Sequence, residues 1–203
     1  MEIFSALLLL LSNSMGINNV TFQFMNGIAT TTLNSFMGYL AESFYIVLPL
    51  IALYMIYRKD RNVYPFVLAA ILLFVVGYGL KTAFHEPRPC SLPQYNWINQ
   101  PSCESGYSFP SDHATVLTGL VLFLGARKRI RALYIIWLAL ELFGRVYLGQ
   151  HYLTDVIVGI AISLIIAYVI YRYKDKVFAL ASKLGLTFFT ERGGRQQQRQ
   201  ATA

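Results

Sequence analysis

The sequence predicts an all-α membrane protein, a polytopic bundle of five transmembrane helices preceded by an N-terminal helix that is interfacial or only partly spanning. Of its 203 residues, 56% are hydrophobic and 13% are charged, a balance typical of an integral membrane domain. The apolar residues form five runs that are long enough, or nearly so, to cross a hydrocarbon core of about 30 Å, which needs about 20 helical residues. These runs cover residues 36–57, 63–84, 113–126, 130–148 and 154–173.

Residues 1–35 form a segment before the first of these runs. Residues 1–11 are apolar but too short to span a bilayer. No Lys or Arg precedes them and Glu2 lies among them, so a cleaved signal peptide is not expected. Residues 17–33 mix polar and apolar side chains, which predicts an amphipathic helix at the membrane surface. A sixth, partial span is the alternative, and it would place the N-terminus in the cytoplasm.

The transmembrane core is expected over residues 36–173, and its third run, residues 113–126, is short. At 1.5 Å per residue a helix of this length covers about 21 Å, which is less than the hydrocarbon thickness. With its basic end at the cytoplasmic surface, its His113 end would stop below the outer surface, recessed toward the lipid head groups. Residues 174–203 are then predicted to form a cytoplasmic amphipathic helix and a basic tail.

Most of the positive charge follows a topology rule. Fourteen of the 17 Lys and Arg residues fall in three clusters, at residues 58–61, 127–131 and 172–199. The positive-inside rule places these clusters, and with them the C-terminus, in the cytoplasm, and residues 85–112 and 149–153 outside. The net charge of +7 is explained in the same way, so no nucleic-acid partner is expected.

The remaining three cations, Lys81, Arg88 and Arg145, lie on the predicted outer side, against this rule. Snorkelling at the interface explains a lone Lys or Arg. Binding phosphate explains all three together, with Arg88 as a planar fork for phosphate oxygens and Lys81 as a point charge.

His151 and Asp155 are four positions apart, so on a helix they share one face. A carboxylate in this position can accept a hydrogen bond from one imidazole nitrogen and orient the other for nucleophilic attack. Arg145 approaches the same face from the N-terminal side. Capping and local hydrogen bonding are the alternative explanation of such a pair.

Residues 110–113 precede the third apolar run, where Ser111 or Asp112 is an ordinary helix N-cap. The free N–H groups and the dipole of a helix N-terminus also favour anion binding. Ser111 would add a hydroxyl donor and His113 a proton that titrates near neutral pH.

Three further residues are notable. Glu141 lies inside the fourth run, where an ionisable group is costly and usually functional, one turn before Arg145, so we expect an ion pair that orients this arginine. Cys90 and Cys103 share one external loop, and free thiols and a disulfide are equally expected. Two cysteines without closer spacing supply too few ligands for a metal site.

Together these residues resemble the signature of the type 2 phosphatidic acid phosphatase superfamily. The matching motifs are Lys81-x6-Arg88-Pro89, Pro110-Ser111-Asp112-His113 and Arg145-x5-His151-x3-Asp155. The family pattern has Gly in place of Asp112 and Ser in place of Gly144. Loss of the hydroxyl at 144 removes one phosphate donor, and Asp112 adds a negative charge beside the site. The form with Asp112 is similar to the undecaprenyl-diphosphate phosphatase branch.

The resemblance implies a two-step displacement without metal or cofactor. His151, oriented by Asp155, would attack phosphorus and form a phosphohistidine. His113 would protonate the leaving oxygen and then activate water. Lys81, Arg88 and Arg145, together with Ser111, would hold the phosphate oxygens.

The expected function is therefore that of an integral lipid phosphatase with its site on the extracytoplasmic face of the plasma membrane. The preferred reaction converts undecaprenyl or another polyprenyl diphosphate to the monophosphate and orthophosphate. A phosphatidylglycerophosphate or phosphatidate phosphatase is the alternative within this class. An anion-binding transporter is the alternative outside it, although transport does not require the His151–Asp155 pair. The sequence leaves the oligomeric state open.

Overall fold

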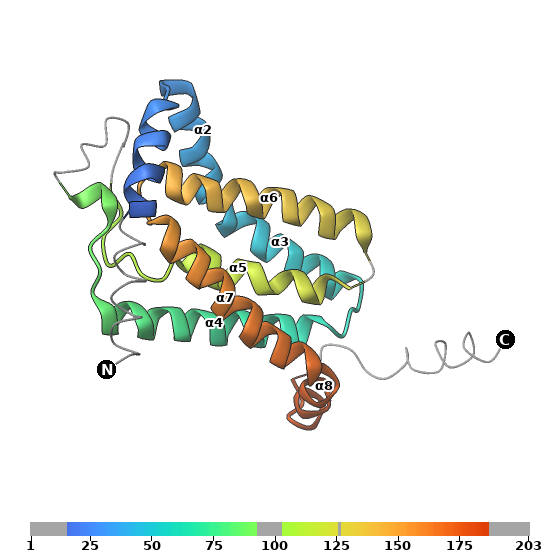
Figure 1. Cartoon of the computed structure of the whole chain (residues 1–203). Coiled ribbons are helices and arrows are strands. Elements are labelled where there is room, and N and C mark those ends of the chain that lie inside the picture. Colours follow the sequence, from blue (N-terminus) through green and yellow to red (C-terminus); the bar gives the residue numbers. More distant parts are fainter. Residues whose placement is uncertain (1–15, 93–102, 126, 187–203) are drawn as a thin grey trace.

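The computed structural model describes residues 16–92, 103–125 and 127–186, and this part of the chain is helical and contains no strand (Figure 1). A helix over residues 16–27 comes first. The labelled helices then follow in the order α2 (Thr31–Glu42), α3 (Phe44–Tyr57), α4 (Val63–Phe84), α5 (Asp112–Leu120), α6 (Lys128–Tyr147), α7 (Leu153–Arg172) and α8 (Lys174–Lys183). Two short 3-10 turns, η1 (Pro89–Ser91) and η3 (Val121–Leu124), follow α4 and α5. Residues 1–11 and the basic tail beyond residue 186 lie outside the described residues.

The number of spans is smaller than predicted when length and composition are the criteria. The segment Val63–Ser91, which contains α4, and helix α7 are each long and apolar enough to cross a membrane, and the bent pair α2–α3 makes a third candidate. The apolar segment Asp112–Leu124 is short, as expected for the third run. Helix α6 has 20 residues but carries basic residues in its first turn and Glu141 and Arg145 near its end. The structure therefore confirms an all-helical membrane bundle but not five spans.

The first predicted run is divided into two helices at Ser43. Helix α2 starts earlier than the apolar run, because Thr30 caps it by accepting a hydrogen bond from the Leu33 N–H at 3.2 Å. Helix α3 leaves α2 at an angle of 40°. At the break, the Ser43 hydroxyl accepts a hydrogen bond of 2.8 Å from the indole N–H of Trp137 in α6. The bend is thus attached to a neighbouring helix.

Helices α5 and α7 pack closely because glycines face small residues across the contact. A Cβ added at Gly119 would lie 2.4 Å from the Cβ of Ala167, and one at Gly159 would lie 2.8 Å from the Cβ of Ala114. The Gly119 N–H also donates a hydrogen bond of 2.7 Å to the Ser163 hydroxyl. This contact brings the first turns of α5 and α7 together, which positions two of the three motifs.

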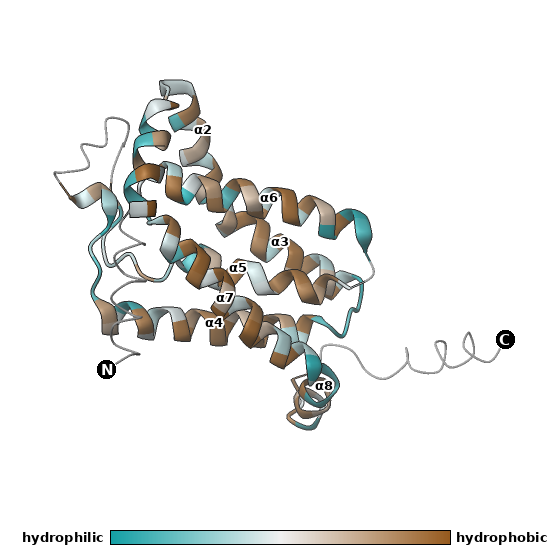
Figure 2. Ribbon diagram, in the orientation of Figure 1, coloured by the Kyte–Doolittle hydropathy of each residue, from teal (hydrophilic) through white to brown (hydrophobic). Residues whose placement is uncertain are grey.

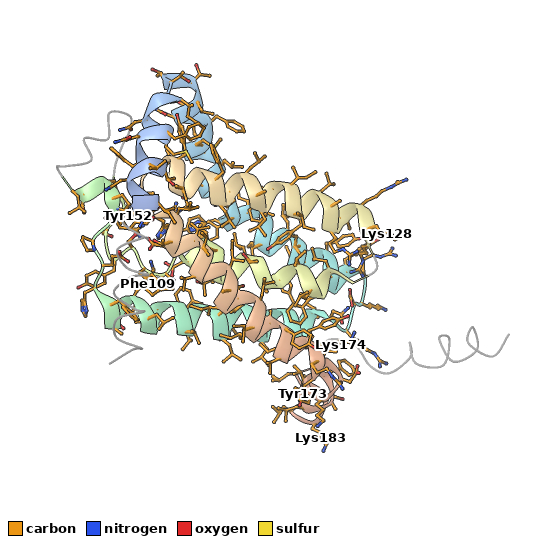
Figure 3. The ribbon with its side chains drawn as sticks, in the orientation of Figure 1. Phe109, Lys128, Tyr152, Tyr173, Lys174 and Lys183 are labelled. Carbon is orange, nitrogen blue, oxygen red and sulfur yellow. A yellow bond between two sulfur atoms is a disulfide. The ribbon has the colours of Figure 1, made fainter. Side chains whose placement is uncertain are left out.

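The basic clusters, as far as the described residues include them, lie at one end of the bundle and the motifs at the other. Asp60, in the α3–α4 link, pairs with Arg127 before α6, and the Arg61 guanidinium lies 4.7 Å from the ring centre of Phe178 in α8. Figure 3 shows Lys128, Lys174 and Lys183 away from Phe109 and Tyr152, which mark the motif end. The hydrophobic residues lie along the helices between these ends (Figure 2). This arrangement agrees with the predicted alternation of loops.

Candidate active site

The three motifs meet at one end of the bundle, although they come from four different helices and their loops. Lys81 is in the last turn of α4 and Arg88 in the following loop. Ser111 and His113 lie at the start of α5, Arg145 lies in the last turn of α6, and His151 and Asp155 flank the start of α7. All seven side chains are buried.

His151 is held through one ring nitrogen. Its Nδ1 lies 2.8 Å from the carbonyl oxygen of Ser108, and since a carbonyl only accepts, Nδ1 carries the proton. Nε2 is then the basic nitrogen of the neutral ring, and it lies 3.3 Å from Nη1 of Arg88. The pKa of His151 lies well below its usual value, first because the ring is buried and then because Arg145, Arg88 and Lys81 are positive. His151 is thus neutral near neutral pH.

Asp155 lies close to His151 but not in the predicted way. Helix α7 begins at Leu153, so His151 lies in the preceding loop and the pair does not share one helix face. Asp155 Oδ2 is 3.6 Å from His151 Nδ1, which is too long for a hydrogen bond. The same oxygen accepts hydrogen bonds from the Ser108 hydroxyl and from the Tyr152 N–H, the latter at 2.9 Å.

Ser108 therefore joins the two residues, and the sequence interpretation did not include it. Its carbonyl oxygen accepts from His151, while its hydroxyl donates to Asp155. Ser108 is fully buried. The only signal in the sequence is its position two residues before Pro110, which alone indicates no such contact.

The two arginines keep donors available at the site. Arg88 Nη1 donates to the carbonyl oxygen of Gln150 at 2.9 Å. In the described part of the chain, Nε of Arg88 and Nε of Arg145 are buried and have no hydrogen-bond partner. Unsatisfied buried donors are unusual, and guanidinium N–H groups are well suited to phosphate oxygens.

Unlike the Nε groups of the two arginines, the ammonium group of Lys81 has partners in the protein. Its Nζ donates to the carbonyl oxygens of Tyr107 at 2.8 Å and Ser108 at 3.3 Å, and it pairs with Asp112 Oδ2 at 3.4 Å. Lys81 thereby fixes the segment that holds His151. Asp112, the departure from the family pattern, places its charge against this lysine.

The other departure from the family pattern lies at a helix contact. A Cβ at Gly144 would lie 3.5 Å from the sulfur of Met37 in α2. The side of α6 that Gly144 presents therefore faces α2, at a distance where a Cβ would make an ordinary van der Waals contact.

Ser111 and His113 occupy the first turn of α5 in different ways. The Ser111 side chain caps the helix by accepting from the Ala114 N–H at 3.5 Å. His113 Nε2 lies 3.4 Å from Oε1 of Glu141, and the Phe44 ring packs against the imidazole with a centroid distance of 4.4 Å. The expected ion pair of Glu141 with Arg145 is not formed among the described residues, where the Glu141 carboxylate lies against the imidazole of His113 instead.

Glu104 is a second residue that the sequence interpretation missed. Its Oε2 lies 2.6 Å from Nη2 of Arg145 and 3.2 Å from Nη2 of Arg88. Burial acts to raise the pKa of Glu104, but the hydrogen bond from Arg145 and the charges of Arg145, Arg88 and Lys81 outweigh it, so the pKa is lowered. Glu104 follows Cys103, which forms a disulfide with Cys90.

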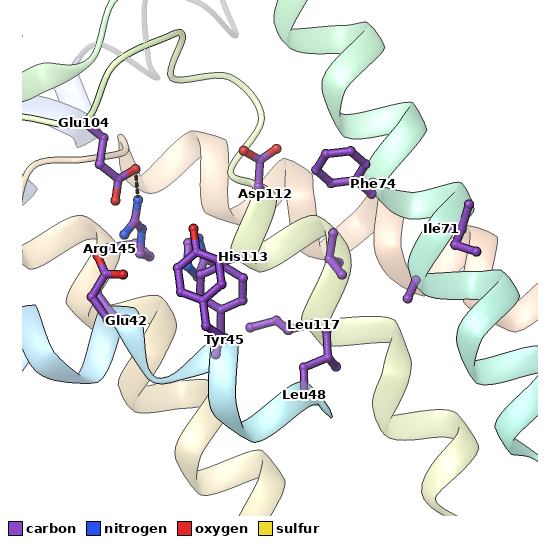
Figure 4. A pocket seen from close by; sticks show the side chains of 14 residues that line it. Glu42, Tyr45, Leu48, Ile71, Phe74, Glu104, Asp112, His113, Leu117 and Arg145 are labelled. Atoms are coloured by element: carbon purple, nitrogen blue, oxygen red, sulfur yellow. Dashed lines mark hydrogen bonds and ion pairs between the residues drawn. The ribbon is translucent and has the colours of Figure 1, made fainter. Parts of the chain in front are cut away.

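An apolar groove of about 510 Å³ leads from this region between α3, α4 and α5. Its apolar wall includes Phe44, Leu48, Ile71, Phe74, Val116 and Leu117. Glu104, Asp112, His113 and Arg145 line its polar end, where Figure 4 shows the Glu104 carboxylate directed at Arg145. The shape and lining suit a molecule with an anionic head and an apolar tail.

Known proteins resemble this chain in sequence and in fold. Undecaprenyl-diphosphatase of Sulfolobus acidocaldarius is 31% identical over 151 residues, which cover 72% of this chain and 73% of that protein. Lipid A 4'-phosphatase of Porphyromonas gingivalis is 29% identical over 162 residues, covering 73% of this chain and 69% of that protein. The crystal structure of LpxE from Aquifex aeolicus matches with a TM-score of 0.66 at 28% identity, covering 75% of this chain and 93% of that one.

A model of the PAP2 superfamily matches residues 62–179, a range that contains all three motifs. The match confirms the resemblance drawn from those motifs. With more than half of its length matched in this way, the chain belongs to the PAP2 superfamily.

Proposed function

We propose that this protein hydrolyses a polyprenyl diphosphate, such as undecaprenyl diphosphate, to the monophosphate and orthophosphate through a phosphohistidine at His151. The observation that carries the proposal is the state of His151. Its Nδ1 donates to Ser108, which leaves a basic Nε2 beside Arg88. A neutral imidazole that is fixed through its other nitrogen is suited to attack phosphorus once Arg88 Nη1, which donates to Nε2 in the free protein, turns to a phosphate oxygen.

In the first step, the lone pair of His151 Nε2 attacks the terminal phosphorus and the bond from phosphorus to the bridging oxygen breaks. His113 donates a proton to that oxygen, and the lipid monophosphate leaves. In the second step, His113 takes a proton from water as the water attacks phosphorus. The phosphorus–nitrogen bond breaks, orthophosphate is released and His151 returns to its neutral form. Every proton transfer uses side chains of this chain, so no metal is required.

The phosphate oxygens would be held by the arginines and by the start of α5. Arg88 and Arg145 each have a buried Nε–H without a partner in the described part of the chain. Ser111 places a hydroxyl at the α5 N-terminus, where backbone N–H groups also favour an anion. Lys81 would contribute positive charge while its Nζ donates to the carbonyl oxygen of Ser108. Such fixed donors stabilise charge as it moves in the transition state.

The groove supports a lipid as the substrate. It joins a polar end that contains Arg145 and His113 to an apolar wall on α3, α4 and α5. A lipid could thus enter sideways from the bilayer with its tail between these helices. The diphosphate is preferred because a relative of 31% identity is named an undecaprenyl-diphosphatase. A relative named lipid A 4'-phosphatase makes a lipid phosphate monoester the alternative.

The site would face the outside of the cell. It lies at the end of the bundle opposite the basic loops, which the positive-inside rule assigns to the cytoplasm. The C-terminus, which follows α8 at the basic end, would then be cytoplasmic.

The test uses the detergent-purified full chain and a panel of lipid substrates that contains polyprenyl diphosphate, phosphatidylglycerophosphate and phosphatidate. We expect orthophosphate release to be fastest from the diphosphate, to persist with excess chelator and to vanish in His151→Asn. If no lipid phosphate releases orthophosphate, the enzyme assignment is wrong. If release stops with chelator, the metal-independent mechanism is wrong.

A further inference from the structure

One carboxylate lies where a phosphate would be expected. Glu104 Oε2 bridges the two guanidinium groups, at 2.6 Å from Nη2 of Arg145 and 3.2 Å from Nη2 of Arg88. We propose that Glu104 is a resident competitor of phosphate: its carboxylate occupies the Arg88–Arg145 pair in the free protein and must leave for any phosphate to bind. The inference rests on the proposed function, since it assigns a role in the same site.

The contacts of Glu104 are those of a substitute anion. A carboxylate and a phosphate both present oxygens that accept from guanidinium N–H groups in the same fork geometry. Because Nη2 of each arginine already donates to or faces Oε2 of Glu104, a phosphate that used these atoms would displace it. An anion that bound beside the carboxylate instead would meet a like charge at short range, which is unfavourable.

Glu104 is held in this place from both sides of the site. The residue before it, Cys103, is joined by the disulfide to Cys90, two positions after Arg88. The Glu104 N–H donates at 3.1 Å to the side-chain oxygen of Gln150, the residue before His151. The Cys90 N–H donates at 3.0 Å to the carbonyl oxygen of Gly149. The segments that carry the cation and the nucleophile therefore also fix the backbone of Glu104.

The side chain itself is free to move away. It is 39% exposed, while those of Arg88 and Arg145 are 6% and 2% exposed. Its carboxylate lies against the buried arginines, and the residue lines the open groove. A rotation of this side chain would expose the arginine pair without a change in the helices.

The consequence is a lower affinity for every phosphate ligand, including the product. Displacement of Glu104 costs the same free energy whether the incoming group is a lipid diphosphate or orthophosphate. On release of orthophosphate the carboxylate returns to the arginines, so the product does not accumulate in the site. Removal of its charge should therefore tighten product binding and raise kcat/KM, since the transition state no longer has to displace an anion.

The matched variants are Glu104→Gln and Glu42→Gln. Glutamine at 104 keeps the shape and removes the charge. Glu42 lines the same groove, and among the described residues no ion pair joins it to Arg88 or Arg145, so its variant reports the through-space effect of one negative charge. Inorganic phosphate is titrated into each purified protein by calorimetry, and kcat/KM is measured with the lipid diphosphate.

We expect Glu104→Gln to bind inorganic phosphate at least about tenfold more tightly, which corresponds to about 1.4 kcal/mol, with a rise in kcat/KM and a much smaller change in Glu42→Gln. Weaker or unchanged phosphate binding in Glu104→Gln would show that the carboxylate positions the arginines and would overturn the proposal, as would an equal gain in Glu42→Gln. Glu104→Ala serves as the second variant if Glu104→Gln does not melt cooperatively. Calorimetry needs no turnover, so a failure of the proposed function is recognised separately, by the absence of phosphate release in the wild type.

Discussion

Oε1 of Glu141 lies 3.4 Å from Nε2 of His113, and this buried pair forms a second histidine–carboxylate contact beside the site of His151. Neither Glu141 oxygen accepts a hydrogen bond within the described residues. We expect this contact to position His113, the proposed acid and base. His151 depends instead on a backbone carbonyl. The two histidines thus have different supports, as different tasks require.

Replacement of Glu141 should slow the phosphorylation step only for substrates whose leaving group needs a proton. We expect Glu141→Gln to lower the single-turnover rate of leaving-group release from a lipid phosphate monoester, whose alkoxide is a poor leaving group, by on the order of a hundredfold. The same rate with p-nitrophenyl phosphate, whose leaving group needs no proton, should change little. The measurement is the ratio of the two single-turnover rates, with Glu141→Asp as the conservative variant that partly restores it. A similar loss for both substrates would indicate a purely structural role.

The close α5–α7 contact predicts that Gly119 tolerates no side chain. The added Cβ of Gly119→Ala would lie 2.4 Å from Ala167 and 2.7 Å from the Ser163 carbonyl oxygen, and overpacking of this kind costs about 1–3 kcal/mol. The melting temperature in detergent should fall, and activity with it, because α5 carries Ser111 and His113. The control is Gly79→Ala in α4, where nothing lies within 4 Å, so alanine should not destabilise the helix. Equal melting temperatures for the two variants would contradict the packing argument.

The lowered pKa of His151 predicts a loss of stability in acid. In the unfolded chain a histidine titrates near about 6.5, whereas folded His151 binds its proton only at lower pH. Below about pH 6.5 the unfolded state therefore holds more protons, and the free energy of unfolding falls as the pH falls toward the folded pKa. In thermal melts at several pH values, the melting temperature should fall more steeply with falling pH for the wild type than for His151→Asn, whose residue 151 cannot titrate. Parallel curves would mean that His151 is not held neutral by the fold.

The sequence predicted those helices that are bounded by strong local signals. Helix α4 has the predicted limits, Val63–Phe84, because a run that is apolar up to Lys81 lies between the charged residues 58–61 and the segment 85–89. The break at Ser43 was not predicted, since only Glu42 and Ser43 interrupt the apolar residues there, and the partner of Ser43, Trp137, comes from a distant helix. Where tertiary contacts decide a boundary, periodicity alone does not report it.

Some residues of the candidate site were likewise predictable from the sequence, and others were not. The motif residues could be chosen because their spacing relates them to one chemistry, and the structure brings them together. Ser108 and Glu104 belong to no motif. Ser108 acts through its backbone carbonyl as well as its hydroxyl, and Glu104 reaches the arginines through a loop fixed by the Cys90–Cys103 disulfide. Both contacts arise from loop conformation, which residue types and spacing do not encode.

The central claim is that His151 becomes phosphorylated, and trapping the phosphoenzyme tests it most directly. The protein is mixed with a lipid diphosphate labelled at its terminal phosphate, quenched under alkaline conditions that preserve phosphohistidine, and digested for mass spectrometry. The account predicts label on His151, a larger amount in His113→Asn, where hydrolysis is slowed, and none in His151→Asn, which should also have no turnover. Label on another residue, or continued turnover in His151→Asn, would contradict the account.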